Sequence, residues 1–185
     1  MSKIGIFMAD GCEEIEGLTV VDVMRRAKLA IETISIMGRR QVTGSHQITF
    51  VTDTLLEEAD YDSYDGIVLP GGIPGTPNLG ANDIVKKVIT RFAEEGKLVA
   101  AICAAPGVLG ENGILKGKKA TCHPGLEANL AGAEVTEENV VRDGNIITSR
   151  GMGTSIDFAL EIVKYIDNKK TDIEHLKKQM VYHCE

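Results

Sequence analysis

Residues 97–107 read Lys97-Leu98-Val99-Ala100-Ala101-Ile102-Cys103-Ala104-Ala105-Pro106-Gly107, and this stretch decides the fold. Its five apolar residues at 98–102 are too few for a helix and are typical of a strand that is buried on both faces. Pro106 suits the first turn of a helix, because its missing N–H is not needed there. Cys103 is therefore predicted at the turn from a central strand into a helix, an arrangement that resembles the nucleophile elbow of hydrolases.

Cys103 has two interpretations. A helix N-terminus beside the sulfur favours the thiolate and predicts a lowered pKa for the thiol. Ala104 and Ala105 leave room for a ligand to approach the sulfur. The alternative is a buried, inert core cysteine, which is a common fate for this residue. Residues 97–107 alone do not separate the two.

The whole chain has the composition of one globular domain. Its 185 residues suffice for a sizeable core, and 43% of them are apolar and 25% charged. The net charge is −7 and no basic block stands out, which gives no support to a nucleic-acid partner. No apolar run approaches the roughly 20 residues of a membrane span. We therefore expect a single domain over residues 1–185, with no nucleic-acid or membrane partner.

The cysteines favour a reducing compartment. They form no C-x-x-C pair and are too sparse for a disulfide scaffold. The N-terminus runs directly into a strand, so no signal peptide is expected and the cytoplasm is the expected location. Cys122 and His123 have no second Cys/His pair to complete a metal site. The glycine-rich loop at 70–78 matches neither a phosphate-binding P-loop nor a dinucleotide fingerprint, so no metal and no cofactor are expected.

Strands and helices are predicted to alternate along the chain. This order indicates one α/β domain with a mostly parallel sheet. Residues 38–45 and 70–78 are expected to be loops. Helices are expected at about 10–28, 83–95, 154–167 and 173–180, and strands at 3–8, 31–37, 47–51, 65–69, 98–102, 118–122, 134–136, 140–141 and 146–148.

Glu16 is an acid at an unusual place on the first helix. At helical spacing it shares a face with Val20, Val23 and Ala27. Burying an ionised carboxylate there is costly, so Glu16 is expected to have a partner or to be protonated with a raised pKa. The alternative is an exposed acid favoured by the positive end of the helix. The apolar residues of this helix cover more than one stripe, which hints at a subunit interface.

His123 follows the short strand at 118–122. Ligands in open α/β sheets gather at the carboxyl ends of the strands, so a histidine there can face the same site as Cys103. The alternative is a structural histidine whose ring is hydrogen-bonded. Both interpretations stay open on the sequence.

Five motifs stand in order along the chain. They are Gly-Cys-Glu-Glu-Ile-Glu at 11–16, Leu-Pro-Gly-Gly at 69–72, Ala-Ala-Ile-Cys-Ala-Ala-Pro at 100–106, Thr-Cys-His-Pro at 121–124 and Thr-Ser-Arg-Gly-Met-Gly-Thr-Ser at 148–155. Together they closely resemble the ThiJ/PfpI superfamily, and within it the DJ-one branch. The resemblance covers nearly the whole chain. It implies a flavodoxin-like three-layer α/β sandwich, with a mostly parallel central sheet flanked by helices, and a homodimer.

The resemblance also implies roles for individual residues. Cys103 matches the reactive elbow cysteine, and Glu16 matches the buried, protonated glutamate that hydrogen-bonds its sulfur. Gly72 and Ala104 match the residues whose backbone N–H groups bind an oxyanion. His123 matches a nearby histidine that in this branch is not clearly oriented as a base for the cysteine.

The implied function is a cysteine-dependent, cofactor-independent enzyme. Its substrates would be small 2-oxoaldehydes such as methylglyoxal, converted to 2-hydroxy acids, or glycated protein side chains. The alternative is a redox sensor or a chaperone that acts through oxidation of Cys103, with Cys12 as another oxidation site and Cys184 as an inconsequential terminal residue. Cysteine peptidases of other branches place a histidine directly after the cysteine, where this chain has Ala104.

One position departs from the pattern of the superfamily. Many relatives carry an arginine where this chain has His46. An interface salt bridge made from that position is therefore in doubt.

Overall fold

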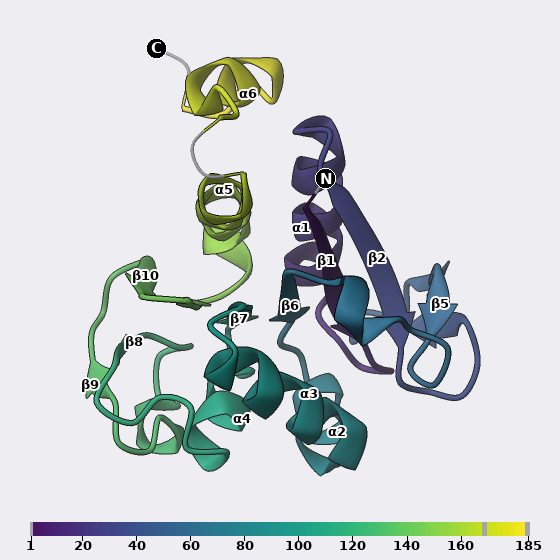
Figure 1. Cartoon of the computed structure of the whole chain (residues 1–185), viewed down its shortest axis with the longest axis vertical. Helices are drawn as coiled ribbons and strands as arrows, with labels where there is room; N and C mark the ends of the chain where they lie inside the picture. The colour runs from purple at the N-terminus through teal and green to yellow at the C-terminus, as the bar shows by residue number, and fades with distance from the viewer. Residues whose placement is uncertain (1, 168–169, 184–185) are drawn as a thin grey trace.

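A computed structural model describes residues 2–167 and 170–183 of the chain. Its centre is a seven-stranded sheet with the strand order β10-β11-β7-β6-β1-β2-β5 (Figure 1). Neighbouring strands are parallel except β10 and β11, which form an antiparallel hairpin. The strands are β1 (Lys3–Met8), β2 (Ala30–Ser35), β5 (Thr54–Leu55), β6 (Gly66–Leu69), β7 (Leu98–Ile102), β10 (Val140–Asp143) and β11 (Ile146–Ser149).

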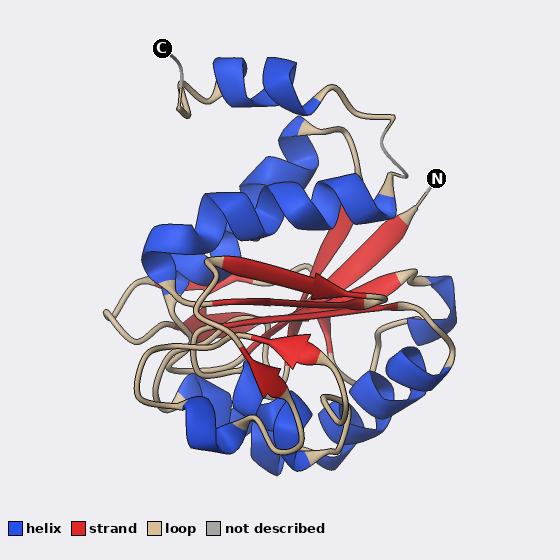
Figure 2. Ribbon diagram, turned by 90° about the vertical axis from the view of Figure 1, so that its left-hand side faces the viewer, coloured by secondary structure: helices blue, strands red, loops and turns tan. Residues whose placement is uncertain are grey.

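Helices cover both faces of this sheet and make three layers (Figure 2). One face carries α1 (Glu14–Arg26) and α5 (Ser155–Ile166), with α6 (Ile173–Gln179) beyond them. The other carries α2 (Gly75–Ala81), α3 (Asp83–Glu94) and α4 (Pro106–Glu111). This three-layer α/β sandwich confirms the expected fold class. Shorter elements are β3 (Gln41–Thr43), β4 (Thr49–Val51), β8 (Lys119–Ala120), β9 (Glu134–Val135) and the 3-10 turns η1 (Tyr61–Ser63), η2 (Glu127–Asn129) and η3 (Met152–Thr154).

The central strand β7 explains the position of the cysteine. All five of its side chains are fully buried, as predicted. Successive side chains point to opposite faces of a sheet. Accordingly Leu98, Ala100 and Ile102 join the core beneath α1 and α5, whereas Val99 and Ala101 join the core beneath α3. The strand ends at Ile102, so the next residue emerges at the carboxyl edge of the sheet.

Several element boundaries differ from those expected. Helix α1 begins at Glu14 and not near residue 10, because the Glu13 side chain accepts the N–H of Glu16 at 2.7 Å and caps the helix there. Residues 41–43, expected to be loop, pair with β4. The expected loop at 70–78 ends where α2 begins, at Gly75. The strand expected at 118–122 is reduced to the two residues of β8.

No helix among the residues described is long and apolar enough to cross a bilayer. The expectation of a single domain over residues 1–185 stays a prediction, because residues 1, 168–169 and 184–185 lie outside the part described.

Candidate active site

Cys103 lies at a sharp turn between β7 and α4. Its φ is +65°, in the left-handed region, which costs an ordinary residue roughly 1–2 kcal/mol. Two backbone hydrogen bonds hold the turn. The N–H of Cys103 donates to the carbonyl of Ser149 at 3.0 Å, and its own carbonyl accepts the N–H of His123 at 2.9 Å. The predicted strand–turn–helix geometry around the cysteine is therefore present.

Glu16 reaches the same point from the first turn of α1. Its side chain is buried, with only 1% of the residue exposed. Its Oε2 accepts the N–H of Gly71 at 2.9 Å, and its carboxylate also accepts a hydrogen bond from the Cys103 thiol. Burial raises the pKa of Glu16 to about 7, because its effect is larger than that of the two hydrogen bonds, which lower the pKa. The burial and raised pKa agree with the expectation for this position.

The pKa of Cys103 corrects an expectation. Burial raises it to about 12, the Glu16 carboxylate adds to the rise, and the N–H groups of Ala104 and Gly72 oppose it by donating to the sulfur. The lowered pKa expected from the helix N-terminus was wrong, because desolvation and the neighbouring acid outweigh these donors. Cys103 and Glu16 thus titrate as a pair that holds one proton between pH of about 7 and about 12.

Two glycines bring the backbone to the sulfur. A Cβ on Gly71 would lie 2.7 Å from both the Cβ of Cys103 and Oε2 of Glu16, so a side chain would separate the pair. Gly72 has φ +95°, and a Cβ there would lie 2.3 Å from the N of Glu13. The pattern Pro-Gly-Gly after a buried strand is the sequence signal for this close approach, although the sequence analysis did not name Gly71 as a site residue.

His123 lies beside the pair, but its ring is oriented by the backbone. Nδ1 is 2.9 Å from the carbonyl oxygen of Pro124. A carbonyl can only accept, so Nδ1 is the donor of this bond, and Nε2 is the nitrogen that holds the lone pair when the ring is neutral. A Cβ on Gly151 would lie 3.6 Å from Cδ2 of His123 and 3.9 Å from Oε1 of Glu16. The imidazole edge and the carboxyl therefore border one space, which Gly151 leaves open.

Comparison with known proteins now identifies the family. The sequence profile described as "DJ-1/PfpI family" matches residues 2–165. The chain belongs to the DJ-1/PfpI family. This is the family that the five sequence motifs resemble.

Three relatives illustrate the similarity. Protein dj-1beta of Drosophila melanogaster is 36% identical over 98% of both chains, and its crystal structure superposes with a TM-score of 0.93 at 34% identity over the full length of both. Protein DJ-1 homolog B of Arabidopsis thaliana is 39% identical over 97% of this chain, which spans only 41% of that protein. Deglycase TK1284 of Thermococcus kodakarensis is 34% identical over 89% of this chain and 99% of its own length.

Two other cysteines of this DJ-1/PfpI protein, Cys12 and Cys122, are buried. Cys12 is fully buried, and burial raises its pKa to about 12, so the structure contradicts its expected role as an oxidation site. Cys122 is 3% exposed, and burial raises its pKa to about 11. Cys103 is partly exposed. Cys184 lies outside the described residues.

His46, the departure from the family pattern, finds partners in its own chain. Its Nδ1 lies 3.0 Å from Oε2 of Glu14 and 3.7 Å from Oε1 of Glu13. These three ligand atoms lie within 4.8 Å of one another, close enough to border a metal ion. Glu14, however, is 3% exposed and already accepts the N–H of His46 at 2.8 Å, and Ser45 Oγ donates to its other oxygen at 3.4 Å. A metal would have to displace these bonds, so we assign the group to loop anchoring.

Proposed function

We propose that this protein is a cysteine-dependent, cofactor-independent enzyme that converts 2-oxoaldehydes such as methylglyoxal to 2-hydroxy acids. The observation that carries the proposal is the surrounding of the Cys103 sulfur. One buried acid, Glu16, and two backbone N–H groups, those of Gly72 and Ala104, all hydrogen-bond to this one atom. The name of the Thermococcus relative, a deglycase, supports action on the adducts of such aldehydes with protein side chains.

The first step uses the single proton of the Cys103–Glu16 pair. Transfer of the thiol proton to Glu16 gives a thiolate next to a neutral carboxyl. The sulfur attacks the aldehyde carbon, an S–C bond forms, and the carbonyl π electrons move to oxygen. The N–H groups of Gly72 and Ala104 stabilise that oxyanion, which then takes the proton of Glu16. The product is a hemithioacetal.

The second step moves a hydrogen within the bound substrate. Glu16, now a carboxylate, removes the proton from the hemithioacetal carbon, and the electron pair left behind forms the C=C bond of an enediolate. The same proton returns to the adjacent carbon, the hydroxyl proton of the hemithioacetal moves to the neighbouring oxygen, and a 2-hydroxy thioester results. Water then cleaves the S–C bond and restores the thiol. We propose that Nε2 of His123 accepts the proton of this water, because its lone pair is free and its ring borders the space beside Glu16. Substrate and product differ by one water, with no net oxidation.

The deciding experiment measures D- and L-lactate from methylglyoxal in the absence of glutathione. We expect lactate from the wild type and none from Cys103→Ala. Lactate from both proteins, or from neither, would overturn the proposal. A stable peptide adduct of methylglyoxal serves as the second substrate. Free methylglyoxal is scavenged during this assay, because aldehyde that is released from the adduct and then converted to lactate would imitate deglycation.

A redox role is the second candidate, because the same three groups suit an oxidised sulfur. A sulfinate on Cys103 would accept the N–H groups of Gly72 and Ala104 and the proton of Glu16. Intact-mass spectrometry under graded peroxide tests it. A sulfinic form of Cys103 that persists on the wild type and is lost in Glu16→Gln supports this role. Oxidation of all thiols to the same extent contradicts it.

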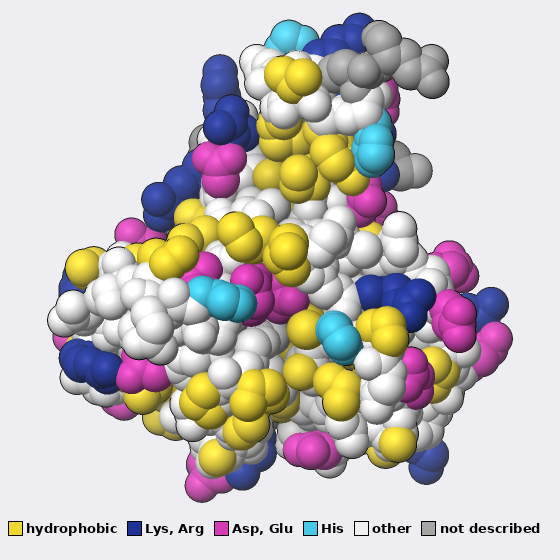
Figure 3. Space-filling model, turned by 180° about the vertical axis from the view of Figure 1, so that it is seen from behind, with side chains coloured by type: hydrophobic (Ala, Val, Ile, Leu, Met, Phe, Trp, Pro, Cys, Tyr) yellow, Lys and Arg dark blue, Asp and Glu magenta, His cyan; other side chains and the backbone are white. Residues whose placement is uncertain are grey.

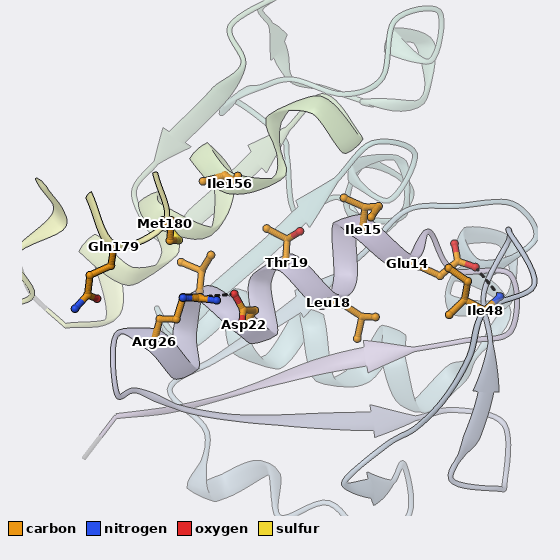
Figure 4. Close-up of a pocket in the computed structure, with 11 residues that line it drawn as sticks. Glu14, Ile15, Leu18, Thr19, Asp22, Arg26, Ile48, Ile156, Gln179 and Met180 are labelled. Carbon is orange, nitrogen blue, oxygen red and sulfur yellow. Dashed lines mark hydrogen bonds and ion pairs between the residues drawn. The ribbon is translucent and has the colours of Figure 1, made fainter. Parts of the chain in front are cut away.

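We also propose that the protein forms a homodimer through the outer face of α1. Ile15 and Leu18 on α1 are 49% and 36% exposed, and Ile48 beside them is 54% exposed. Figure 4 shows these side chains with Ile156 of α5 and Met180 at the end of α6 around one hollow. Seen from the back, apolar side chains gather below α6 (Figure 3). A second copy of the chain would cover this surface.

The free thiols suit a reducing compartment, which supports the cytoplasm as the location of the protein.

A further inference from the structure

Gly151 leaves a space between the two side chains of the site that can take up protons. A Cβ on Gly151 would lie 3.9 Å from Oε1 of Glu16 and 3.6 Å from Cδ2 of His123, the ring carbon bonded to Nε2. These are ordinary van der Waals distances, so a methyl group or a water molecule fits at this point. The φ of Gly151 is 164°, extended backbone that any residue adopts. The backbone conformation therefore does not require a glycine here.

A cavity of about 410 Å³ adjoins this space. Gly151 and His123 border both the cavity and the space, and Arg150 and Thr154 also line the cavity. His123 is exposed, so the cavity is open to solvent. Water that enters by the cavity meets a carboxyl oxygen of Glu16 and the imidazole edge at its inner end. Two to four polar partners are what an enclosed water needs, so the chemistry of this space suits a water molecule.

Two hydroxyl groups hold Gly151 in place. Oγ1 of Thr154 accepts the N–H of Gly151 at 3.2 Å, and the carbonyl of Gly151 accepts the N–H of Thr154 at 2.9 Å. Oγ of the fully buried Ser149 donates to the carbonyl of Asn139 at 2.7 Å. That bond uses the only proton of the Ser149 hydroxyl, because a carbonyl can only accept. The Thr154 proton is therefore shared between Ser149 Oγ, 2.7 Å away, and the Gly151 carbonyl, 2.9 Å away.

Ser149 connects this wall to the nucleophile. Its carbonyl accepts the N–H of Cys103 at 3.0 Å, while its hydroxyl contacts Thr154. Thr154 is the N-cap residue of α5, but among the described residues its side chain makes no capping hydrogen bond to that helix. The hydroxyl of Thr154 thus serves the backbone of Gly151 and the end of β11, and not the start of α5.

We propose that the space beside Gly151 holds the water that cleaves the thioester, and that Thr154 is a positioning residue that keeps this space open. The proposal rests on the proposed function and assigns a place to its last step. The oxygen of this water bonds to the acyl carbon on Cys103, and its proton goes to Nε2 of His123. The C–S bond then breaks, and the sulfur takes that proton to restore the thiol.

The test supplies the acyl group directly and needs no aldehyde. p-Nitrophenyl acetate acetylates Cys103: an S–C bond forms, a C–O bond breaks, nitrophenolate leaves and the thiol proton goes to solvent. The burst of nitrophenolate gives the rate of acylation. Intact mass with peptide mapping then follows the loss of the acetyl group from Cys103, which gives the rate of hydrolysis. Cys103→Ala supplies the background.

Gly151→Ala places a methyl group at the proposed position of the water without straining the backbone. We expect the acetyl group to be lost at least about tenfold more slowly, because a displaced reactant costs that much or more, while acylation keeps the wild-type rate. Gly153→Ala is the matched control in the same loop. A Cβ there would have no described residue within 4 Å besides its chain neighbours, so this variant should hydrolyse the acetyl group at the wild-type rate.

Thr154→Val removes the hydroxyl and keeps the shape of the side chain. Hydrolysis should again slow about tenfold with acylation unchanged, and Thr154→Ser should restore it, because serine supplies the hydroxyl. Equal rates of acetyl loss in Gly151→Ala and Gly153→Ala would overturn the proposal. Equal slowing of acylation and hydrolysis in Thr154→Val would also overturn it, because that result indicates a general disturbance of the site.

The outcome is distinguishable from a failure of the proposed function. A wild type that loses the acetyl group in a manner that depends on Gly151, but forms no lactate from methylglyoxal, would overturn the enzyme and leave the water site standing. Lactate formation together with unchanged hydrolysis in Gly151→Ala would leave the enzyme standing and overturn the water site.

Discussion

The backbone N–H of His123 donates to the carbonyl of Cys103 at 2.9 Å, while the ring of His123 is held by the carbonyl of Pro124. The two residues are thus joined through the main chain, and the imidazole makes no hydrogen bond to the sulfur among the described residues. Glu16 is the group that accepts a hydrogen bond from the thiol. In this arrangement the side chain that contacts the thiol is Glu16, so the His123 ring is available for a different step of the reaction.

His123→Asn tests this separation. We expect iodoacetamide to alkylate Cys103 at the wild-type rate, because the partner of the sulfur is Glu16. Lactate formation should fall about 10²-fold or more, because the water that cleaves the thioester loses its base. Intact mass should then show a lactoyl group accumulating on Cys103. Slower alkylation without an accumulating thioester would assign His123 to activation of the thiol instead.

Glu16→Gln tests the shared proton. The singly protonated pair is the reactive form, so wild-type alkylation should rise up to a pH of about 7, where Glu16 loses its proton, and then level off. In the variant that inflection should be absent, and lactate formation should fall about 10²–10⁴-fold. Glu174→Gln, a change on the exposed face of α6, should keep the wild-type profile. The same inflection in Glu16→Gln would show that another group sets it.

Glu16 also predicts how stability depends on pH. Its pKa is raised from 4.5 to about 7, so its stability contribution is fully present below pH 4.5 and is lost as the pH rises through 7. The loss is about 3 kcal/mol, because each tenfold change in proton affinity corresponds to about 1.36 kcal/mol. Glu16→Gln avoids it. Relative to the wild type, the variant should therefore gain unfolding free energy in urea between pH 4 and pH 8. A difference that is constant over this range contradicts the buried-acid assignment.

Leu18→Asp tests the dimer. A carboxylate in the centre of the exposed face of α1 would be desolvated on association, so light scattering should give the mass of a monomer. Ile84→Asp is the matched control, since Ile84 on α3 is 38% exposed and Leu18 is 36% exposed. This variant should keep the mass of the dimer. A wild type that is already monomeric, or equal masses for all three proteins, would remove the proposal.

Local patterns in the sequence were enough for most of the fold. The continuous apolar run of β7 and the proline at 106 placed the elbow, and the alternation of strands and helices gave the sandwich. The helix boundaries that were predicted wrongly depend on local interactions that apolar periodicity does not reveal. A glutamate cap set the start of α1, and α2 lies inside a segment whose glycines and prolines are typical of a loop.

Less of the site could be predicted from the sequence, because the pKa values of its residues depend on segments that are far apart in the chain. The position of Glu16 on an apolar stripe revealed its burial. The pKa of Cys103 is shifted in the direction opposite to that expected, since burial raises it and the carboxylate that adds to the rise lies 87 residues earlier in the chain.

The two loops behind the site are interlocked, and this has a consequence for the cost of binding. Gly75 donates its N–H to Gly11 at 3.1 Å and Glu13 donates to Gly71 at 2.9 Å. A Cβ on Gly75 would lie 2.5 Å from the N of Cys12. Neither loop can shift without breaking both contacts, so the amides of Glu13 and Gly75 should exchange with deuterium only on global opening. The backbone of both loops is therefore held in place before any substrate arrives, so little of the cost of binding goes into ordering it.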